Sequence, residues 1–419
     1  MTARRLSGDD GEQGTVLVQV AVALLALLAL SAFVVDYGVM WASRGQAQTA
    51  ADSGALAGAM SLAFDSPTDL AGARARAIAM AARNRVWGQA PSVTDGDVTF
   101  PACPPGAPGP PDTCVKVDVF RNQARGNALP TFFGPLAEIK NQGVRATATA
   151  QITTGNATDC LRPWAVADKW EERWENGKAS IAPWTPDSTF DKYDDKGNLD
   201  PKVTMPDVYR PPTATDPGTG FTPFDADGNP TAYYGLEMTL KNGDSKANLS
   251  SGWFLGLNLP DGNGNPTNGG STYRDNIANC NPHVFAIGDT IEVESKQGDM
   301  VGPTKQGVED LMALDKNATW NTSTKSIDNS CAPGVCGDLK YHASSPRIVP
   351  VALFNLDAFF DGNPNGKSEI PIANIMGFFV EGMSGKDVLG RLVAIPGTSK
   401  GTSSLPTSSS FMRQVLLVR

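Results

Sequence analysis

A run of 21 residues, 15–35, contains no charged side chain, and it constrains the fold of this chain more than any other feature. It reads TVLVQVAVALLALLALSAFVV, and its only polar side chains are Thr15, Gln19 and Ser31. As an α-helix, such a run spans about 31 Å, the thickness of the hydrocarbon core of a bilayer. It is too long for the apolar region of a secretory signal peptide, and no small-residue cleavage pattern follows it before Asp36. The sequence therefore predicts a helix that stays in the membrane.

The basic residues that flank the run predict its orientation. Arg4 and Arg5 precede it, whereas Arg44 is the only basic residue among the 20 positions that follow it. Basic residues accumulate on the cytoplasmic side of a span. We therefore expect a single-pass protein of the inner (cytoplasmic) membrane, with residues 1–14 as a cytoplasmic head, a transmembrane helix at 15–36, and the bulk of the chain periplasmic or extracellular.

Six cysteines, all of which follow the membrane run, suit an oxidising compartment. Cys103 is close in sequence to Cys114, and Cys331 is close to Cys336, so two local disulfides are expected, which leaves Cys160 to pair with Cys280. Other pairings of the six cysteines, and buried free thiols, remain alternatives.

The charge of the chain is distributed unevenly. The whole chain has 35 basic and 44 acidic residues, but the first 152 residues hold 12 of each, so the acidic excess lies in the C-terminal two-thirds. Such a surface repels phosphate groups, and a nucleic-acid partner is therefore not expected.

The helix is predicted to continue beyond the membrane, because no proline occurs between Asp36 and Pro67. Small residues at a spacing of about four form one smooth face along it. Each glycine inside a helix costs about 1 kcal/mol relative to alanine, so close packing should offset that cost. The face could dock a helix of a partner, or a second helix of this chain predicted near 69–87. Its residues are Ala47, Ala51, Gly54, Ala55, Gly58 and Ala59.

Gly14 directly precedes the membrane run and marks a possible processing site at Gly14–Thr15. A cut there would make Gln19 the fifth residue of the mature chain. Type IV pilin-like proteins are cut after such a glycine and carry glutamate at that fifth position. Because glutamine stands here instead, an uncut chain, in which Gly14 only ends the head, is the favoured alternative.

The segment from Gly14 to Ala63 resembles the N-terminal region of TadG-like proteins of the Tad (Flp, tight-adherence) pilus-assembly machinery. The resemblance covers about 50 residues and implies a role in building or anchoring a pilus, with other Tad pilus-assembly proteins as partners. It rests on the glycine entry, the apolar run and a set of positions beyond it, namely Asp36, Gly38, Gln48, Ala50, Ala51, Asp52, Ala55, Leu56, Ala57, Gly58 and Ala59.

Alternating apolar residues predict strands after the second helix, at 115–119 and 144–152. We expect residues 37–152 to form a long helix with a small pilin-like antiparallel sheet, and residues 153–419 to form a β-rich domain with long loops. The predicted fold class is thus α+β. Further strands are expected at 234–240, 252–259, 283–294, 347–356 and 376–381, with a helix at 304–315.

Three loops rich in Asp and Asn could bind a hard cation such as calcium. The strongest candidate, DGNPNGKSE, offers Asp361, Asn363, Asn365 and Glu369, although the twelfth position of a calcium loop is Ile372 here. Asp/Asn/Gly clusters also form ordinary turns. The two weaker candidates are Asp225, Asp227 and Asn229, and Asp261, Asn263 and Asn265.

Enzymatic signatures are scarce in this sequence. The two histidines, His283 and His342, form no H-E-x-x-H motif, and no G-x-S-x-G or phosphate-binding loop is present. The D-x-S-x-S pentapeptide of the von Willebrand A module, which many TadG-like proteins carry, is also absent. We therefore expect a non-enzymatic component of Tad pilus assembly. A stand-alone, membrane-anchored calcium-binding adhesin is the alternative, followed by a periplasmic hydrolase.

Overall fold

The computed structural model divides into two compact units. The first comprises Met1–Ala55, Ala77–Thr99 and Lys116–Thr149, and the second Leu56–Arg76, Phe100–Val115 and Ala150–Arg419. The residues that the structure describes are 10–175, 178–179, 183–194, 196–242, 249–261, 264–293, 300–330, 345–361, 369–401 and 405–418.

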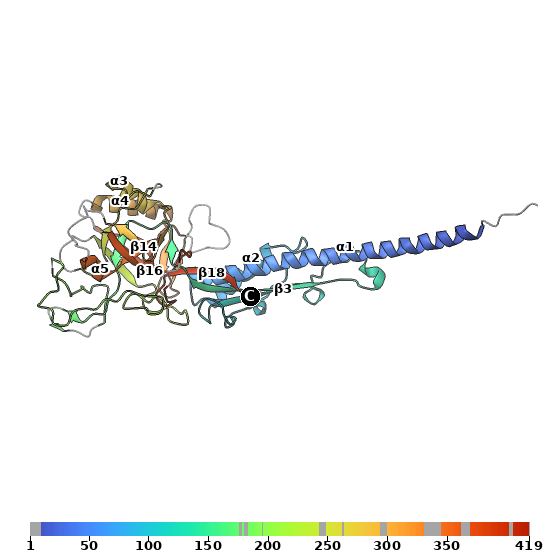
Figure 1. The fold of residues 1–419 in the computed structure, drawn as a ribbon, viewed down its shortest axis with the longest axis horizontal. Helices are drawn as coiled ribbons and strands as arrows, with labels where there is room; N and C mark the ends of the chain where they lie inside the picture. The colour runs from blue at the N-terminus through green and yellow to red at the C-terminus, as the bar shows by residue number, and fades with distance from the viewer. Residues whose placement is uncertain are drawn as a thin grey trace, which may run out of the picture. The chain divides into compact units, whose positions relative to one another are not determined.

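The helices are dominated by one long N-terminal element (Figure 1). In chain order they are α1 (Asp10–Met60), its π-helical continuation η1 (Ser61–Asp65), α2 (Leu70–Arg83), the 3-10 turns η2 (Asp95–Asp97), η3 (Gln123–Arg125) and η4 (Gly134–Ala137), then α3 (Gly270–Ala278), α4 (Val301–Leu314) and α5 (Leu356–Asp361).

Among the described residues, the strands belong to one five-stranded sheet, one seven-stranded sheet and three short pairs. They are β1 (Val98–Thr99), β2 (Cys114–Arg121), β3 (Val144–Thr154), β4 (Ala157–Thr158), β5 (Trp164–Ala167), β6 (Trp174–Glu175), β7 (Lys178–Ala179), β8 (Glu237–Asn242), β9 (Trp253–Gly256), β10 (Phe285–Ala286), β11 (Thr290–Glu292), β12 (Thr319–Asn321), β13 (Ser326–Asp328), β14 (Ile348–Phe354), β15 (Glu369–Ser384), β16 (Asp387–Val393), β17 (Ile395–Pro396) and β18 (Met412–Val418).

In the first unit, side-chain alternation follows the pleat of the strands. Val117 and Val119 of β2, and Ala146 and Ala148 of β3, are buried, while the residues between them are more exposed. β1 pairs with β2 in antiparallel register, with Val98 opposite Val117. Within this unit the strand order is β1-β2-β3.

The second unit is built on a hydrogen-bonded ring of strands. The seven-stranded sheet has the order β11-β15-β14-β5-β9-β8-β16, and β15 pairs with β16 as well as with β14. This extra pairing closes the six strands from β15 to β16 on themselves, with β11 added to the start of β15. Closure leaves these strands fewer free edges than an open sheet would have.

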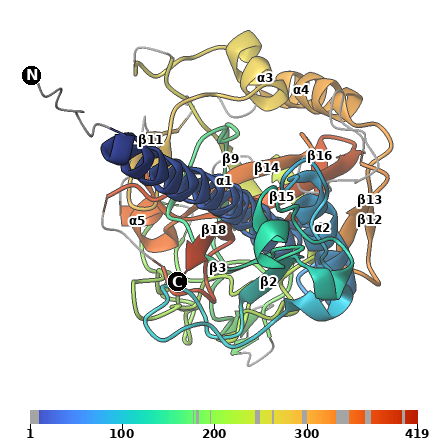
Figure 2. The ribbon, with the colours of Figure 1, turned by 90° about the vertical axis from the view of Figure 1, so that its right-hand side faces the viewer.

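Both faces of β14 are buried. Along β14, Val351 belongs to one hydrophobic cluster and its neighbour Ala352 to another, so β14 is apolar nearly throughout. α3 and α4 lie side by side in the same unit (Figures 1 and 2), and they contribute Ile277 and Val308 to the cluster that contains Val351. An ion pair of 2.7 Å between Arg274 and Asp310 links the two helices at their surface.

The α+β fold class and the long helix predicted from the sequence are confirmed. α1 begins at Asp10, within the segment predicted as a head, and helical structure continues to Asp65, two residues before Pro67. Residues 56–76 and 100–115 belong to the second unit, and the predicted domain boundary near residue 153 stays a prediction. The closed ring was not predicted.

Candidate functional site

The side chains in the apolar half of α1 are exposed. Leu17 is 73% exposed and Leu25 is 67% exposed, and an 18-residue apolar stretch of this helix has no buried residue. A core helix of similar composition would bury such side chains within its own domain. α1 is therefore long and apolar enough to cross a bilayer, and none of the residues of this stretch is buried within the described chain.

Farther along α1, the small-residue face is covered from within the chain. Ala47, Ala51 and Ala55 are fully buried. A Cβ atom on Gly54 would lie 3.0 Å from the carbonyl oxygen of Ala77 and 3.1 Å from the Cβ of Ala81, both on α2. The absence of a side chain thus lets α1 approach α2 closely, which is the second of the two alternatives drawn from the sequence.

Gly58 and Ala59, the remaining two residues of the predicted packing face, are also buried. They belong to the second unit, whereas Gly54 and Ala55 belong to the first.

Polar side chains tie this part of α1 to the first unit. The Gln48 amide donates to the carbonyl oxygen of Thr147 in β3 over 3.1 Å and to the Asp52 carboxylate over 2.8 Å. The Gln46 side-chain oxygen accepts the backbone N–H of Trp87 over 2.7 Å. The QAQTAAD segment therefore carries a buried small-residue stripe together with polar contacts to its own unit.

At the end of the apolar run, Asp36 holds a distant loop. Its carboxylate accepts the backbone N–H groups of Phe132, Phe133 and Gly134, over 2.7, 3.0 and 2.6 Å. The Gln142 amide donates to the backbone carbonyl of Asp36 over 3.3 Å. A carboxylate accepts hydrogen bonds more strongly than a neutral group does, so Asp36 is well suited to fix this loop. The sequence singled out Asp36 but not the loop that it binds.

The cysteines form two disulfides in the second unit, Cys103–Cys114 and Cys160–Cys280. Cys331 and Cys336 lie outside the described residues. Asp159 lies close to the Cys160–Cys280 disulfide, so these three residues could be taken for a metal site. The two sulfur atoms are bonded to each other, however, and are therefore not thiolate ligands for a metal.

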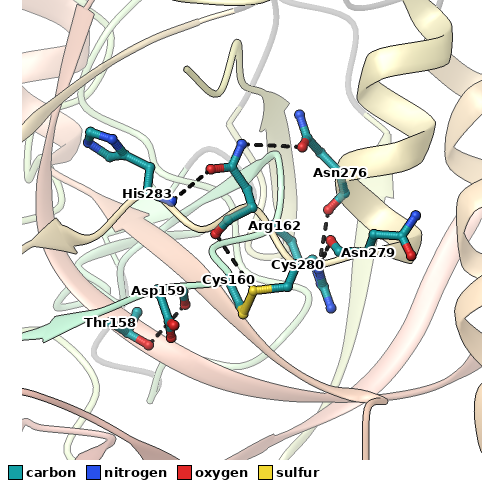
Figure 3. The surroundings of a disulfide bond; sticks show 9 residues. Thr158, Asp159, Cys160, Arg162, Asn276, Asn279, Cys280 and His283 are labelled. Atoms are coloured by element: carbon teal, nitrogen blue, oxygen red, sulfur yellow. Dashed lines mark hydrogen bonds between the residues drawn. A yellow bond between two sulfur atoms is a disulfide. The ribbon is translucent and has the colours of Figure 1, made fainter. Parts of the chain in front are cut away.

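The Cys160–Cys280 bridge lies beside the end of α3 (Figure 3). The guanidinium of Arg162 donates to the carbonyl oxygens of Asn276 and Asn279, which the last turn of a helix leaves without intrahelical partners. The backbone N–H of Cys160 donates to the carbonyl of Asn281 over 2.9 Å. Burial lowers the pKa of Arg162 to about 10. These contacts describe a structural junction rather than a reactive site.

Two of the three acidic loops are only partly described. Asp361 is the last residue of α5 and Glu369 the first of β15, while Asn363 and Asn365 lie outside the described residues, as does Asn263. Whether calcium binds there is untested by the structure.

In the other two loops the acidic side chains accept backbone hydrogen bonds of their own turns. The Asp225 carboxylate accepts the N–H groups of Asp227 and Asn229 over 3.0 and 2.8 Å. The Asp261 carboxylate accepts the N–H of Asn265 over 3.0 Å. Both arrangements are ordinary turn structure.

Sequence reasoning missed a set of buried acids in the second unit. Asp168 is fully buried and accepts the N–H of Phe221 over 3.1 Å and the hydroxyl of Tyr209 over 3.1 Å, and burial raises its pKa to about 6. Burial, together with the charge of Asp207, raises the pKa of Glu172 to about 7. Nothing in the local sequence marks these positions, because their burial depends on chain segments brought together by the fold.

One segment of the chain matches a known protein family. Residues 14–61 match a family model described as "Putative Flp pilus-assembly TadE/G-like". The N-terminal segment is TadE/G-like. The TadE/G-like segment covers α1 from Gly14 to the end of the helix. It therefore includes both the exposed apolar half and the buried small-residue face. No curated protein and no solved structure matches the chain.

Proposed function

We propose that this chain is a non-enzymatic, single-pass membrane component of a Tad (Flp) pilus-assembly machinery. The observation that carries the proposal is that the TadE/G-like segment and the exposed apolar helix are the same stretch of chain. An apolar surface of this size is stable in lipid but not in water. The family that the segment matches is described by assembly and not by a reaction, which supports a structural role.

The N-terminus is proposed to lie in the cytoplasm, and the chain beyond the span outside it. Arg4 and Arg5 precede the span and Arg44 follows it, which favours a cytoplasmic N-terminus. The Cys103–Cys114 and Cys160–Cys280 bridges suit an oxidising compartment. The chain that follows the span would then lie on the outer side of the inner membrane, with lipid as one partner and other pilus-assembly proteins as the others.

The part of the chain that follows the span is proposed to supply the surface that docks other pilus-assembly proteins. The small-residue face of α1 at Gly54 already packs against α2, so it is not the surface offered to a partner. The closed strand ring instead provides a rigid scaffold for the long loops of the second unit, and loops on a rigid scaffold are frequent binding sites.

The chain is proposed to remain uncut at Gly14–Thr15 and to act as a permanent anchor. Gln19 replaces the glutamate that pilin-like substrates carry at the corresponding position. Mass spectrometry of the N-terminus, on protein taken from native membranes, tests this. A start at Met1 or Thr2 supports the anchor, whereas a start at Thr15 indicates a processed, pilin-like subunit.

The role itself is tested by complementation of a chromosomal deletion. We expect the deletion to abolish surface pili and the intact gene to restore them. A chain with Leu25→Arg and Leu28→Arg should fail, because each arginine at mid-span costs about 3 kcal/mol on insertion, whereas Leu25→Ala with Leu28→Ala should complement. Normal piliation in the deletion strain would contradict the proposal.

A further inference from the structure

The residues between Leu129 and Gln142 form a loop of the first unit whose two ends are joined by hydrogen bonds. Backbone hydrogen bonds of 2.8 and 3.3 Å between Leu129 and Gln142 pinch its ends together. Inside the loop, the η4 turn packs so tightly that a Cβ on Gly134 would lie 2.5 Å from the carbonyl oxygen of Ile139. The loop is therefore a compact structure with a defined shape.

Asp36 fastens this loop to the end of the apolar run. The three N–H groups that its carboxylate accepts come from consecutive residues, 132–134, so the loop backbone lies against α1 at that height (Figure 1, teal turn beside the blue helix). Asp36 and the loop both belong to the first unit.

The side chains that the loop presents are apolar and exposed. Phe132 is 57% exposed, Phe133 43% and Ile139 55%. Large exposed apolar side chains that cluster in this way usually mark a surface that is covered in the functional state.

A groove of about 380 Å³ runs between the loop and α1. On the loop side it is lined by Phe133 and Ile139, and on the helix side by Ala29, Ala32 and Phe33, which belong to the uncharged run. Ala29 precedes Asp36 by seven residues, or about 10 Å along a helix. The groove thus reaches into the segment that is proposed to lie in lipid.

An aromatic ladder continues the same surface. Phe33 stacks on Tyr37 with ring centroids 5.8 Å apart, and Tyr37 stacks on Trp41 at 6.4 Å. All three rings are exposed. Tyrosine and tryptophan concentrate where the hydrocarbon core of a bilayer meets its headgroups. The ladder therefore places the groove and the loop at that interface.

We propose that residues 130–141 form a second lipid-contacting element, which inserts Phe132, Phe133 and Ile139 into the bilayer interface beside the anchor. The occupant of the groove is phospholipid. Interfacial elements bury apolar side chains to a depth of about 5–10 Å, which agrees with the reach of the groove along α1. The inference rests on the membrane anchoring of the proposed function, and adds a second contact with the membrane, at residues 130–141.

Photocrosslinking of the full chain in lipid vesicles tests the inference. Benzoylphenylalanine is introduced singly at Phe132, at Phe33 as the position inside the span, and at Asp95 as an exposed control in the same unit. The vesicles consist of phosphatidylethanolamine and phosphatidylglycerol that carry an alkyne-tagged acyl chain. We expect tagged-lipid adducts at positions 132 and 33, each about ten-fold above the yield at 95.

The pattern of adducts separates the two claims. Adducts at position 33 but not at 132 would overturn the lipid-contacting loop and leave the anchor intact, whereas no adduct at either position would overturn the anchor as well. Adducts at 132 with a second copy of the chain, or with another protein, would show that the groove holds a protein rather than lipid, and would also overturn the inference.

A second variant tests whether the three hydrogen bonds of the Asp36 carboxylate position the loop. Asp36→Asn replaces a charged acceptor with a neutral group of equal size, so lipid adducts at 132 should fall several-fold while adducts at 33 persist. A cooperative urea unfolding transition of the full-length variant, close to that of the wild-type chain, verifies that the variant folds. Unchanged adducts at 132 in a folded Asp36→Asn chain would show that these hydrogen bonds do not position the loop.

Discussion

Gly54 of α1 faces Ala77 of α2 so closely that a Cβ on Gly54 would lie 3.0 Å from the Ala77 carbonyl oxygen. Backbone is the least yielding neighbour that a new side chain can meet. The contact explains why a glycine, otherwise unfavourable inside a helix, stands at this point in the TadE/G-like segment.

Gly54→Val should lower the free energy of unfolding of the first unit by about 1–3 kcal/mol, because the branched side chain forces α1 and α2 apart. The matched control is Gly45→Val, on the same helix, where a Cβ meets nothing within 4 Å. Urea titration of the full chain in detergent micelles measures both. Equal stability of the two variants would contradict close packing at Gly54.

Removal of the two described disulfides should have unequal effects. Cys160–Cys280 links residues 120 apart, whereas Cys103–Cys114 links residues 11 apart. Loop-closure entropy then predicts losses of about 5 and about 3 kcal/mol for the paired Cys→Ser variants. Comparison of their unfolding free energies, with the other bridge intact, checks the order. A larger loss for Cys103→Ser with Cys114→Ser would show that native-state packing outweighs chain entropy.

The buried acids should make stability depend on pH. Glu172 has a pKa of about 7 in the folded chain against an ordinary value of 4.5. Between these values the folded state binds more protons than the unfolded state, so stability falls as pH rises from about 4.5 to about 7. Glu172→Gln should therefore raise the urea midpoint at pH 7.5 and leave it nearly unchanged at pH 4.

A control variant separates this effect from a general loss of charge. Glu171, the neighbouring residue, is exposed and paired with Arg173 over 2.9 Å. Glu171→Gln should keep the wild-type slope of stability against pH. Asp168 should leave a residual slope in the Glu172 variant, since its pKa is also raised, to about 6. An unchanged slope in Glu172→Gln would exclude Glu172 as its source.

Calcium binding at the loop between Asp361 and Glu369 remains a prediction from the sequence. Millimolar calcium should raise the thermal midpoint of the chain, magnesium should not, and Asp361→Ala should abolish the shift. Asp225→Ala should retain it, since the Asp225 carboxylate already accepts two backbone N–H groups of its own turn. A calcium shift that survives in Asp361→Ala would place the site elsewhere.

The features that were predicted correctly depend on local patterns. The apolar run, the absence of proline to Pro67 and the valine alternation of β2 each act within a few turns or one strand, so the sequence alone indicates them. The closed strand ring depends instead on pairing of β14 with β5 and of β15 with β16, which no local pattern specifies.

The same reasoning explains what was missed near the anchor. Asp36 was noted as part of a family resemblance, but the hydrogen-bond partners of its carboxylate lie 96 to 98 residues away in sequence. No local pattern around Phe132 and Phe133 indicates that contact. The small-residue face was found from its spacing, yet spacing could not decide between α2 and a partner helix as its neighbour.

The central claim is that residues 15–35 lie in the bilayer and the folded remainder lies outside the cytoplasm. Protease treatment of spheroplasts, followed by alkaline carbonate extraction, tests it directly. The account predicts that the chain stays with the membrane pellet, and that protease removes the chain beyond Asp36 while it spares a short N-terminal fragment. Recovery of an intact, protease-protected chain in the soluble cytosolic fraction would contradict it.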